Sequence, residues 1–486
     1  MRFYIPLLAL LLTACARPTP EKQAVNDAAA ALGGAERIAA VKTIVIEGEG
    51  TQYNLGQDVV PGASGQTFTV NPYKRSIDVQ AGRSRTELTR TPNFAYFLGR
   101  TAQRQIQGID GTIGYNVAPS GTASRVAEAA VTDRRAELLR HPVPAVRAAL
   151  DPASRLTNLR TQNGQTTIDV SVEDGRLFTL AIDSATKLPV SVTTPANHGN
   201  LGDVRVSTTF AEYKGAGNLQ LPTRLTTKTD AFTTMEVRVT KQTVDADSGD
   251  LAAPAAVAAA PAPVAAAPNV TVTEVSSGIW QLAGGSHRSV LVEFADRLVL
   301  IEAPQNDART LAVIARAREL RPGKPLTHVV NTHHHFDHSG GIRAAVSEGL
   351  TLITHQGNAA FFEEIIKRPH TLVPDALSKK WGGKAGPQDP PYVTEPVNGE
   401  KIITDGSMVM NLYEVPGEHS NTMLMAYFPR ERLLVEGDLY EADEALHMFA
   451  ARFLEELKKR NLRIERIVSL HSDVVPYARL LGDAAK

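Results

Sequence analysis

The sequence predicts two domains of different fold class: an N-terminal, mostly antiparallel β domain with a few helices, and a C-terminal α/β domain. From Lys42 to about Thr243, short β-rich runs alternate with Gly, Asn, Asp and Pro turns, as in an antiparallel sheet. Between Asp245 and Asn269 the composition changes abruptly to Ala and Pro. From Val270 onward, strands alternate with helices, which is typical of a layered α/β domain.

Length and composition agree with a core-forming protein of more than one domain. At 486 residues the chain exceeds one ordinary domain. Hydrophobic residues make up 43% and charged residues 21%, as in ordinary globular proteins. Lys plus Arg number 51 against 52 for Asp plus Glu, so the formal net charge is -1. This balance gives no electrostatic reason to expect nucleic acid as a partner.

Residues 1–15, MRFYIPLLALLLTAC, are typical of an export signal. Arg2 precedes an apolar run that is too short to span a membrane and matches the central region of a secretory signal. The ending LTAC resembles a bacterial lipobox, which implies cleavage before Cys15, the only cysteine, and lipid on its sulfur. No Asp follows Cys15, so we expect a periplasmic lipoprotein anchored to the outer membrane. The alternative is a plain signal peptide with an incidental cysteine.

Residues 16–244 are predicted to form the β-rich N-terminal domain. Residues 16–21 read as a tether, and the Ala-rich stretch that follows predicts two short helices separated by Gly33-Gly34. A helical break at 133–150 interrupts the strands. The layout and the opening ALGGAERIAAVKTIVIEGEG resemble the LolA/LppX-like periplasmic lipoprotein-carrier fold. That resemblance implies an apolar groove for a lipid or other apolar ligand; the alternative is a β scaffold without a ligand.

Residues 245–269 are predicted to be a semi-extended Ala/Pro linker, and residues 270–486 the α/β domain. Its first 35 residues, 270–304, read as several strands joined by tight turns. A helix at 307–320, a strand at 326–332, a helix at 340–349 and a strand at 351–355 follow. The segment 368–398 is rich in Pro and Gly, and we expect it to form a flap over the binding cleft.

The stretch THHHFDHSGG, from Thr332 to Gly341, predicts a metal site. In an extended segment, residues two apart point to the same side, so His333, His335 and Asp337 project together while His334 and Phe336 face away. His338 turns in just before the small residues that open the next helix. Imidazoles and a carboxylate suit a divalent ion such as zinc. Four ligands so close together exceed what one tetrahedral ion takes, which favours two ions.

Three more candidate ligands each follow the end of an apolar strand, where loops converge on a cleft: His419, Asp438 and His471. Among the other histidines, His355 ends a strand and could lie near the site. His287, His370 and His447 have no ligand-like context, and His328 is expected to be packed.

With these residues, the last 215 or so residues resemble the metallo-β-lactamase superfamily, with its αββα sandwich and HxHxDH signature. The resemblance implies that His333, His335 and His419 hold one metal and that Asp438 bridges to the second. The resemblance also implies that the second metal is held by Asp337, His338 and His471. Ser472 and the short stretch between Asp438 and His471 depart from the family pattern.

This ligand set implies two zinc ions, with iron or manganese as alternatives. Two such ions lower the pKa of a shared water toward about 7, giving a hydroxide that attacks an acyl carbon. Asp337 and Asp438 are the expected catalytic residues, with Asp337 handling a proton. A ligand set with a bridging aspartate and many histidines resembles that of the ester, lactone and thioester hydrolases of the superfamily. The alternatives are a β-lactamase-type amide hydrolase, or a periplasmic carrier of hydrophobic ligands with a subsidiary metal domain.

Overall fold

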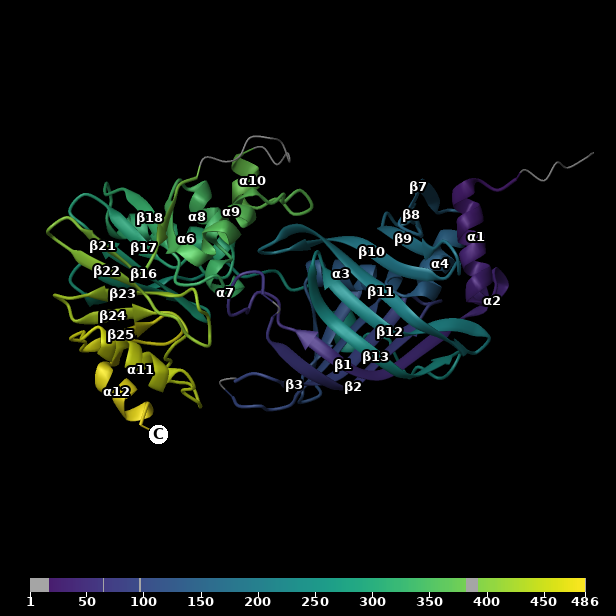
Figure 1. The fold of residues 1–486 in the computed structure, drawn as a ribbon, viewed down its shortest axis with the longest axis horizontal. Coiled ribbons are helices and arrows are strands. Elements are labelled where there is room, and N and C mark those ends of the chain that lie inside the picture. The colour runs from purple at the N-terminus through teal and green to yellow at the C-terminus, as the bar shows by residue number, and fades with distance from the viewer. Residues whose placement is uncertain (1–16, 64, 96–97, 382–391, 486) are drawn as a thin grey trace, which may run out of the picture.

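The computed structural model describes residues 17–485 except 64, 96–97 and 382–391. Two bodies lie side by side in Figure 1, the N-terminal β domain and the C-terminal α/β domain, so both predicted fold classes are confirmed. The expected signal and Cys15 lie outside the described residues. Within the described part of the chain, no helix has the length and apolar character needed to cross a membrane.

The N-terminal domain is built on one antiparallel sheet of 13 strands. Its spatial order is β6-β5-β4-β3-β2-β1-β13-β12-β11-β10-β9-β8-β7, so nearly all neighbours are consecutive hairpins. The strands are β1 (Thr43–Tyr53), β2 (Thr67–Asp78), β3 (Arg83–Pro92), β4 (Gln103–Asp110), β5 (Ile113–Val117), β6 (Ala123–Arg125), β7 (Arg155–Gln162), β8 (Gln165–Ser171), β9 (Leu177–Asp183), β10 (Pro189–His198), β11 (Gly202–Ala216), β12 (Leu219–Thr229) and β13 (Phe232–Val244).

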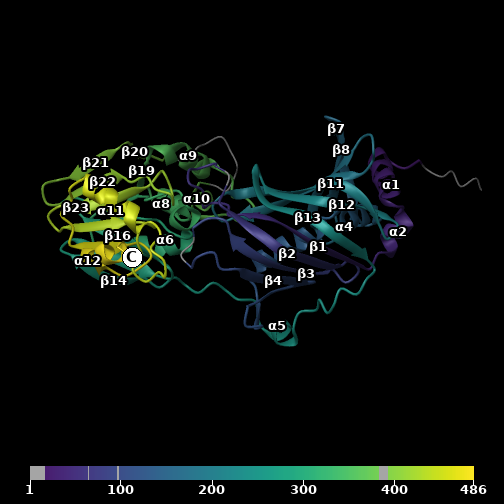
Figure 2. The same ribbon diagram turned by 60° about the horizontal axis from the view of Figure 1, so that its bottom comes forward.

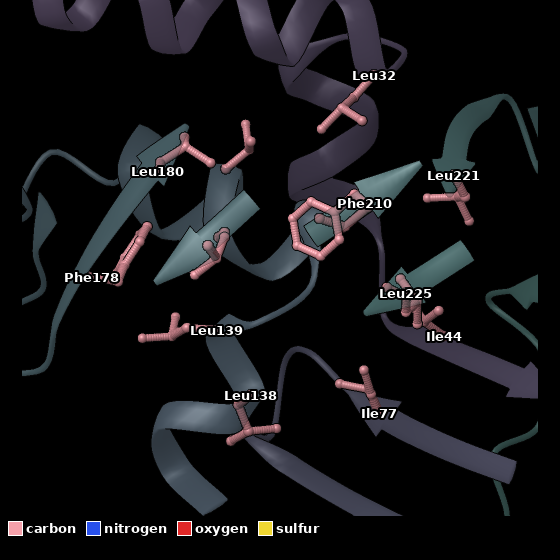
Figure 3. Packing of buried hydrophobic residues seen from close by; sticks show 14 of the residues in the cluster. Leu32, Ile44, Ile77, Leu138, Leu139, Phe178, Leu180, Phe210, Leu221 and Leu225 are labelled. Carbon is pink, nitrogen blue, oxygen red and sulfur yellow. The ribbon is translucent and has the colours of Figure 1, made fainter. Parts of the chain in front are cut away.

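Four helices cover one face of this sheet: α1 (Pro20–Leu32), α2 (Ala35–Ala40), α3 (Glu128–Leu139) and α4 (Pro142–Leu150). The predicted break at 133–150 is two helices, because His141 leaves the helical conformation and Pro142 begins the next helix. Apolar side chains of the helices and the sheet form one core (Figure 3), in which Leu32, Phe178 and Phe210 are buried. Burying such a side chain contributes about 1.5–3 kcal/mol.

The linker packs against the surface of the N-terminal domain. It contains one short helix, α5 (Ala255–Ala259), between two prolines (Figure 2). Tyr115 donates its hydroxyl hydrogen to the Leu251 carbonyl over 3.3 Å, and Leu251 is buried. Arg125 donates to the Ala260 carbonyl over 2.5 Å. The prediction of a semi-extended segment missed these contacts, because they join residues more than 130 positions apart.

Two sheets face each other in the C-terminal domain. The first, in the order β14 to β20, contains β14 (Thr271–Ser276), β15 (Ile279–Gly284), β16 (His287–Glu293), β17 (Leu298–Ile301), β18 (Leu326–Val330), β19 (Thr351–His355) and β20 (Thr394–Val397). The second contains β21 (Glu400–Thr404), β22 (Val409–Glu414), β23 (Leu424–Phe428), β24 (Leu433–Glu436), β25 (Arg466–Ser469) and β26 (Val475–Pro476).

Three apolar clusters show the αββα layering. One lies between the sheets and includes Val292 and Phe428. A second joins the outer face of the first sheet to α6 (Asp307–Leu320), α8 (Ile342–Ser347), α9 (Ala359–Lys367) and α10 (Ala376–Lys380). The third joins the second sheet to α11 (Ala450–Lys459) and α12 (Tyr477–Asp483). In α11 and the residue before it, Phe449, Phe453 and Leu457 recur every four residues, which gives the helix one apolar face.

Candidate metal centre

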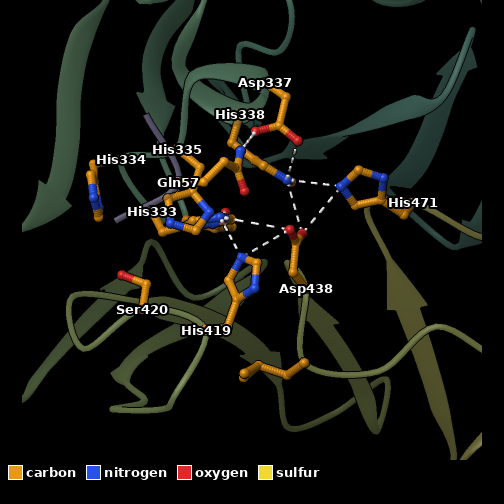
Figure 4. A network of polar contacts seen from close by, with 12 residues as sticks. Gln57, His333, His334, His335, Asp337, His338, His419, Ser420, Asp438 and His471 are labelled. Atoms are coloured by element: carbon orange, nitrogen blue, oxygen red, sulfur yellow. Dashed lines mark hydrogen bonds and ion pairs between the residues drawn. The ribbon is translucent and has the colours of Figure 1, made fainter. Parts of the chain in front are cut away.

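The seven predicted ligands come from loops that leave the carboxyl ends of strands. His333 and His335 follow β18, and Asp337 and His338 lie on the single turn α7 (Phe336–Ser339). His419 follows β22, Asp438 follows β24 and His471 follows β25. Because β18 belongs to one sheet and β24 and β25 to the other, the loops meet at the edge where the two sheets face each other. Figure 4 shows all seven side chains turned toward one another.

The first cluster brings together His333, His335, His419 and Asp438, with one ligand atom of each within 4.8 Å of the others. The Nε2 atoms of His419 and His333 are 3.2 Å apart, and Asp438 Oδ2 lies 3.0 Å from His419 Nε2. His335 Nδ1 is buried and has no hydrogen-bond partner. An unpartnered buried nitrogen beside two converging imidazoles fits a ligand atom of a divalent cation.

The second cluster brings together Asp337, His338, His471 and, in addition, His287. The Nε2 atoms of His338 and His471 are 2.9 Å apart, and His287 Nε2 lies 3.3 Å from Asp337 Oδ2. The interpretation that His287 has no ligand-like context is therefore corrected. His287 begins β16, and the backbone bond from Arg288 N to the Leu470 carbonyl holds that strand end beside His471.

Asp438 stands between the two clusters and presents one carboxylate oxygen to each. Oδ2 lies 3.0 Å from His419 Nε2, whereas Oδ1 lies 2.9 Å from His338 Nε2 and 3.2 Å from His471 Nε2. The turn that carries Asp438 is fixed by the buried Glu436, whose carboxylate accepts the backbone N–H groups of Leu439 and Tyr440. A carboxylate held in this orientation can be shared by two ions.

A second buried acid, Glu302 at the end of the β17 segment, orients the rings. Its carboxylate accepts from His338 Nδ1 over 3.1 Å and from Asn331 Nδ2 over 2.9 Å, and also from the Thr332 hydroxyl. The bond to Nδ1 leaves His338 Nε2 facing the centre, as in carboxylate–histidine–metal arrangements. Glu302 was not among the predicted site residues, although an acid directly after the apolar run LVLI was a signal.

In the first cluster, the surroundings favour the protonation states that metal ligands need. Burial and the neighbouring histidines hold the pKa values of His333 and His335 well below the ordinary imidazole value, so both rings are neutral at pH 7. Burial alone would raise the pKa of Asp438, but His338, His471 and His419 hold it well below its usual range.

The second cluster attracts positive charge. Burial would lower the pKa of His338 and of His471, but the carboxylate of Asp438 raises both above the ordinary value. Asp337 has a pKa below its usual range: burial opposes this, and His338 and His287 outweigh it. Glu441 forms a further group with Asp438 and His471, and burial raises its pKa to about 7. A site with ionised carboxylates among converging imidazoles fits divalent cations.

Other predicted residues lie away from the centre. His334 belongs to neither cluster and lies apart from the other labelled histidines in Figure 4. Its Nδ1 is 3.4 Å from the Thr422 hydroxyl. His355 lies 3.1 Å from Glu414 instead of reaching the clusters. The motif is extended only as far as His335, because α7 begins at Phe336. The described part of the 368–398 segment packs through α10 against α8, and residues 382–391 of the expected flap lie outside the described residues.

Adjacent histidines provide a matched test of this arrangement. We expect His335→Ala to lose about one bound metal ion per chain, because it removes the unpartnered Nδ1 of the first cluster. His334→Ala should keep the wild-type metal content, because its ring faces Thr422. Elemental analysis of the two folded variants checks both outcomes. If His334→Ala released metal as His335→Ala does, the assignment of ligands in this segment would be wrong.

Comparison with known proteins agrees with the resemblance. Residues 282–477, which contain both clusters, match the family model described as the metallo-beta-lactamase superfamily. A metallo-beta-lactamase from Pontibacter korlensis is 17% identical over 45% of this chain and 98% of its own length, with a TM-score of 0.35. A metallo-beta-lactamase from Hirschia baltica is 15% identical over 44% of this chain and 96% of its own, with a TM-score of 0.33.

The DIM-1 metallo-beta-lactamase is 15% identical over 45% of this chain and 96% of its own, with a TM-score of 0.34. A search of curated proteins finds no match to the chain. The matched residues all lie in the C-terminal domain, so the likeness of the N-terminal domain to a lipoprotein carrier stays a prediction.

Proposed function

We propose that this protein, whose C-terminal domain belongs to the metallo-β-lactamase superfamily and is a metal-dependent hydrolase, is a dinuclear zinc enzyme acting on an ester, lactone or thioester. The first ion would be held by His333, His335 and His419. The second would be held by Asp337, His338 and His471, with His287 beside them. Asp438 would bind both. When bound, two such ions lower the pKa of a shared water toward about 7 and polarise a substrate carbonyl.

The observation that supports this proposal most is the orientation of Asp438. Its two oxygens lie 2.9–3.2 Å from histidines of different clusters, as a bridging ligand requires. The side chain of Asp337 is 36% exposed, which is more than that of any other proposed ligand. A substrate that approaches from this side would meet Asp337 first, with His287 hydrogen-bonded behind it.

A substrate screen of the zinc-loaded full chain tests the proposal. Esters, lactones and thioesters should be turned over faster than phosphodiesters and β-lactams, and elemental analysis should find about two zinc equivalents per chain. Fewer than about one equivalent would contradict the dinuclear site. Preferred hydrolysis of β-lactams would replace the proposed substrate class with the amide alternative. Retained activity with iron or manganese would show which metals the site accepts.

Binding of an amphipathic molecule by the N-terminal domain is a second candidate function. A cavity of about 190 Å³ lies within this domain. Leu225 and Met235 line it together with the charged side chains of Arg75, Glu137 and Arg140, so its lining is both apolar and charged. A ligand with an acyl tail and an anionic head would match this lining. Mass spectrometry of solvent extracts from the purified chain should reveal such a lipid; its absence would remove the support for a carrier.

We also propose export and attachment to the outer membrane, on the support of residues 1–15 alone. Metabolic labelling with palmitate tests this, with Cys15→Ala as the control. Label in the wild-type protein and none in the variant would support a lipid anchor. An unlabelled wild-type protein would contradict the lipid anchor and leave the plain signal peptide as the interpretation of residues 1–15.

A further inference from the structure

A loop of the N-terminal domain reaches the metal centre of the C-terminal domain. This loop, residues 54–63, follows β1 and is named here the 54–63 loop. In Figure 1 the chain leaving β1 runs to α7 at the junction of the two domains, and Figure 4 shows Gln57 beside Asp337. The contact joins residues that are 280 positions apart in the sequence.

The 54–63 loop bonds directly to two of the proposed ligands. Gln57 donates its amide hydrogen from Nε2 to Asp337 Oδ1 over 2.8 Å. His335 Nε2 lies 2.9 Å from the main-chain carbonyl oxygen of Asp58. Each contact leaves the other polar atom of the same side chain available: Asp337 Oδ2 lies 3.3 Å from His287 Nε2, and His335 Nδ1 is buried without a hydrogen-bond partner.

Main-chain bonds fix the loop on both sides of the centre. The N–H of Phe336, in the first turn of α7, donates to the Gly56 carbonyl over 3.2 Å, and the Phe336 carbonyl accepts from Asn200 Nδ2 over 3.0 Å. On the opposite side, the N–H of Asn421 donates to the Val59 carbonyl over 2.8 Å. The loop therefore spans from the His335 segment to the His419 segment.

Close packing supports these bonds. Gly56 has φ +82°, and a Cβ built at Gly56 would lie 2.1 Å from the Phe336 ring, so only glycine allows this approach. Around it, an apolar cluster from both domains includes Leu201 and Ile365. Arg368 also forms an ion pair with Asp230 of the N-terminal domain.

We propose that Gln57 and the Asp58 carbonyl are positioning groups of the metal centre, so that the hydrolase site is completed by the N-terminal domain. The inference rests on the proposed metal-dependent function. The carbonyl of Asp58 accepts the Nε2–H of His335, which selects the tautomer with a free lone pair on Nδ1. Gln57 holds one carboxylate oxygen of Asp337 and leaves the other directed at the second cluster.

Two substitutions at Gln57 test this in the full chain. Gln57→Ala removes the donor, and Gln57→Glu places a second carboxylate against Asp337. We expect the affinity for the second ion to fall by about 10- to 100-fold in Gln57→Ala, as for other groups that orient ligands, and to fall further in Gln57→Glu. Gln162→Ala and Gln162→Glu are matched controls, because Gln162 is exposed at the end of β7. Competition with a chelator and the absorption spectrum of the cobalt-substituted protein measure the effect.

A second pair of variants tests the placement of the loop itself. Gly56→Ala and Gly62→Ala introduce the same methyl group at positive φ, but the Cβ at Gly62 would meet nothing within 4 Å. Only Gly56→Ala should change the cobalt spectrum and weaken metal binding. Wild-type affinity and spectrum in both Gln57 variants and in Gly56→Ala would overturn the inference while leaving the proposed function intact. A wild-type chain that bound no ion would overturn both.

Discussion

Asp438→Ala should empty both halves of the metal centre and reduce hydrolysis to the background rate. Asp438 is the only described residue that lies within 3.2 Å of histidines of both clusters. Removing a group that only orients a ligand lowers metal affinity or activity by about 10- to 100-fold. Removing a ligand shared by two ions should therefore lower kcat/KM by more than about 100-fold.

Elemental analysis and rates on the best substrate of the screen measure this prediction. Asp443→Ala is the matched control, since Asp443 is exposed five positions along the same loop. The control should keep wild-type metal content and activity. If Asp438→Ala still bound two ions, Asp438 would not be the bridge. If it bound none but remained as active as the wild type, the reaction would not depend on metal.

Glu302→Gln should have the next largest effect, on metal affinity and on stability together. The fully buried carboxylate accepts from His338, Asn331 and Thr332. An amide of the same shape replaces one acceptor oxygen by a donor NH₂, which cannot accept from these groups. We expect metal affinity to fall by about 10- to 100-fold and the free energy of unfolding to fall by about 1–3 kcal/mol from the unsatisfied donor.

Chelator competition and thermal unfolding of the metal-free chain separate the two effects. Glu400→Gln serves as the control, because Glu400 is exposed on β21. Glu400→Gln should leave both measurements unchanged. Wild-type metal affinity in a folded Glu302→Gln chain would show that the ring of His338 is positioned without the carboxylate.

Local patterns were sufficient to predict the layers and the position of the site. Strand alternation indicated the antiparallel sheet, and His419, Asp438 and His471 each follow an apolar run that forms a strand. The resemblance added the grouping into two metals. His334 was expected to face away, and the structure places it outside both clusters.

The features that sequence analysis missed depend on contacts between distant parts of the chain. His287 joins the second cluster because β16 is bonded to the end of β25, more than 180 residues later. The 54–63 loop carries no motif, and its role appears only when the domains are placed together. Local periodicity reports which face of an element is buried, but it does not report which other element covers that face.

The Gln57–Asp337 contact has an evolutionary consequence. Hairpin loops are ordinarily the places where chains accept insertions and drift in sequence. Here the 54–63 loop and the HHHFDH segment are separated by about 280 residues and yet share one set of bonds. Change in either one is therefore constrained by the other. Related chains should either retain both partners or lose both, and exchange of the N-terminal domain for an unrelated one should be selected against.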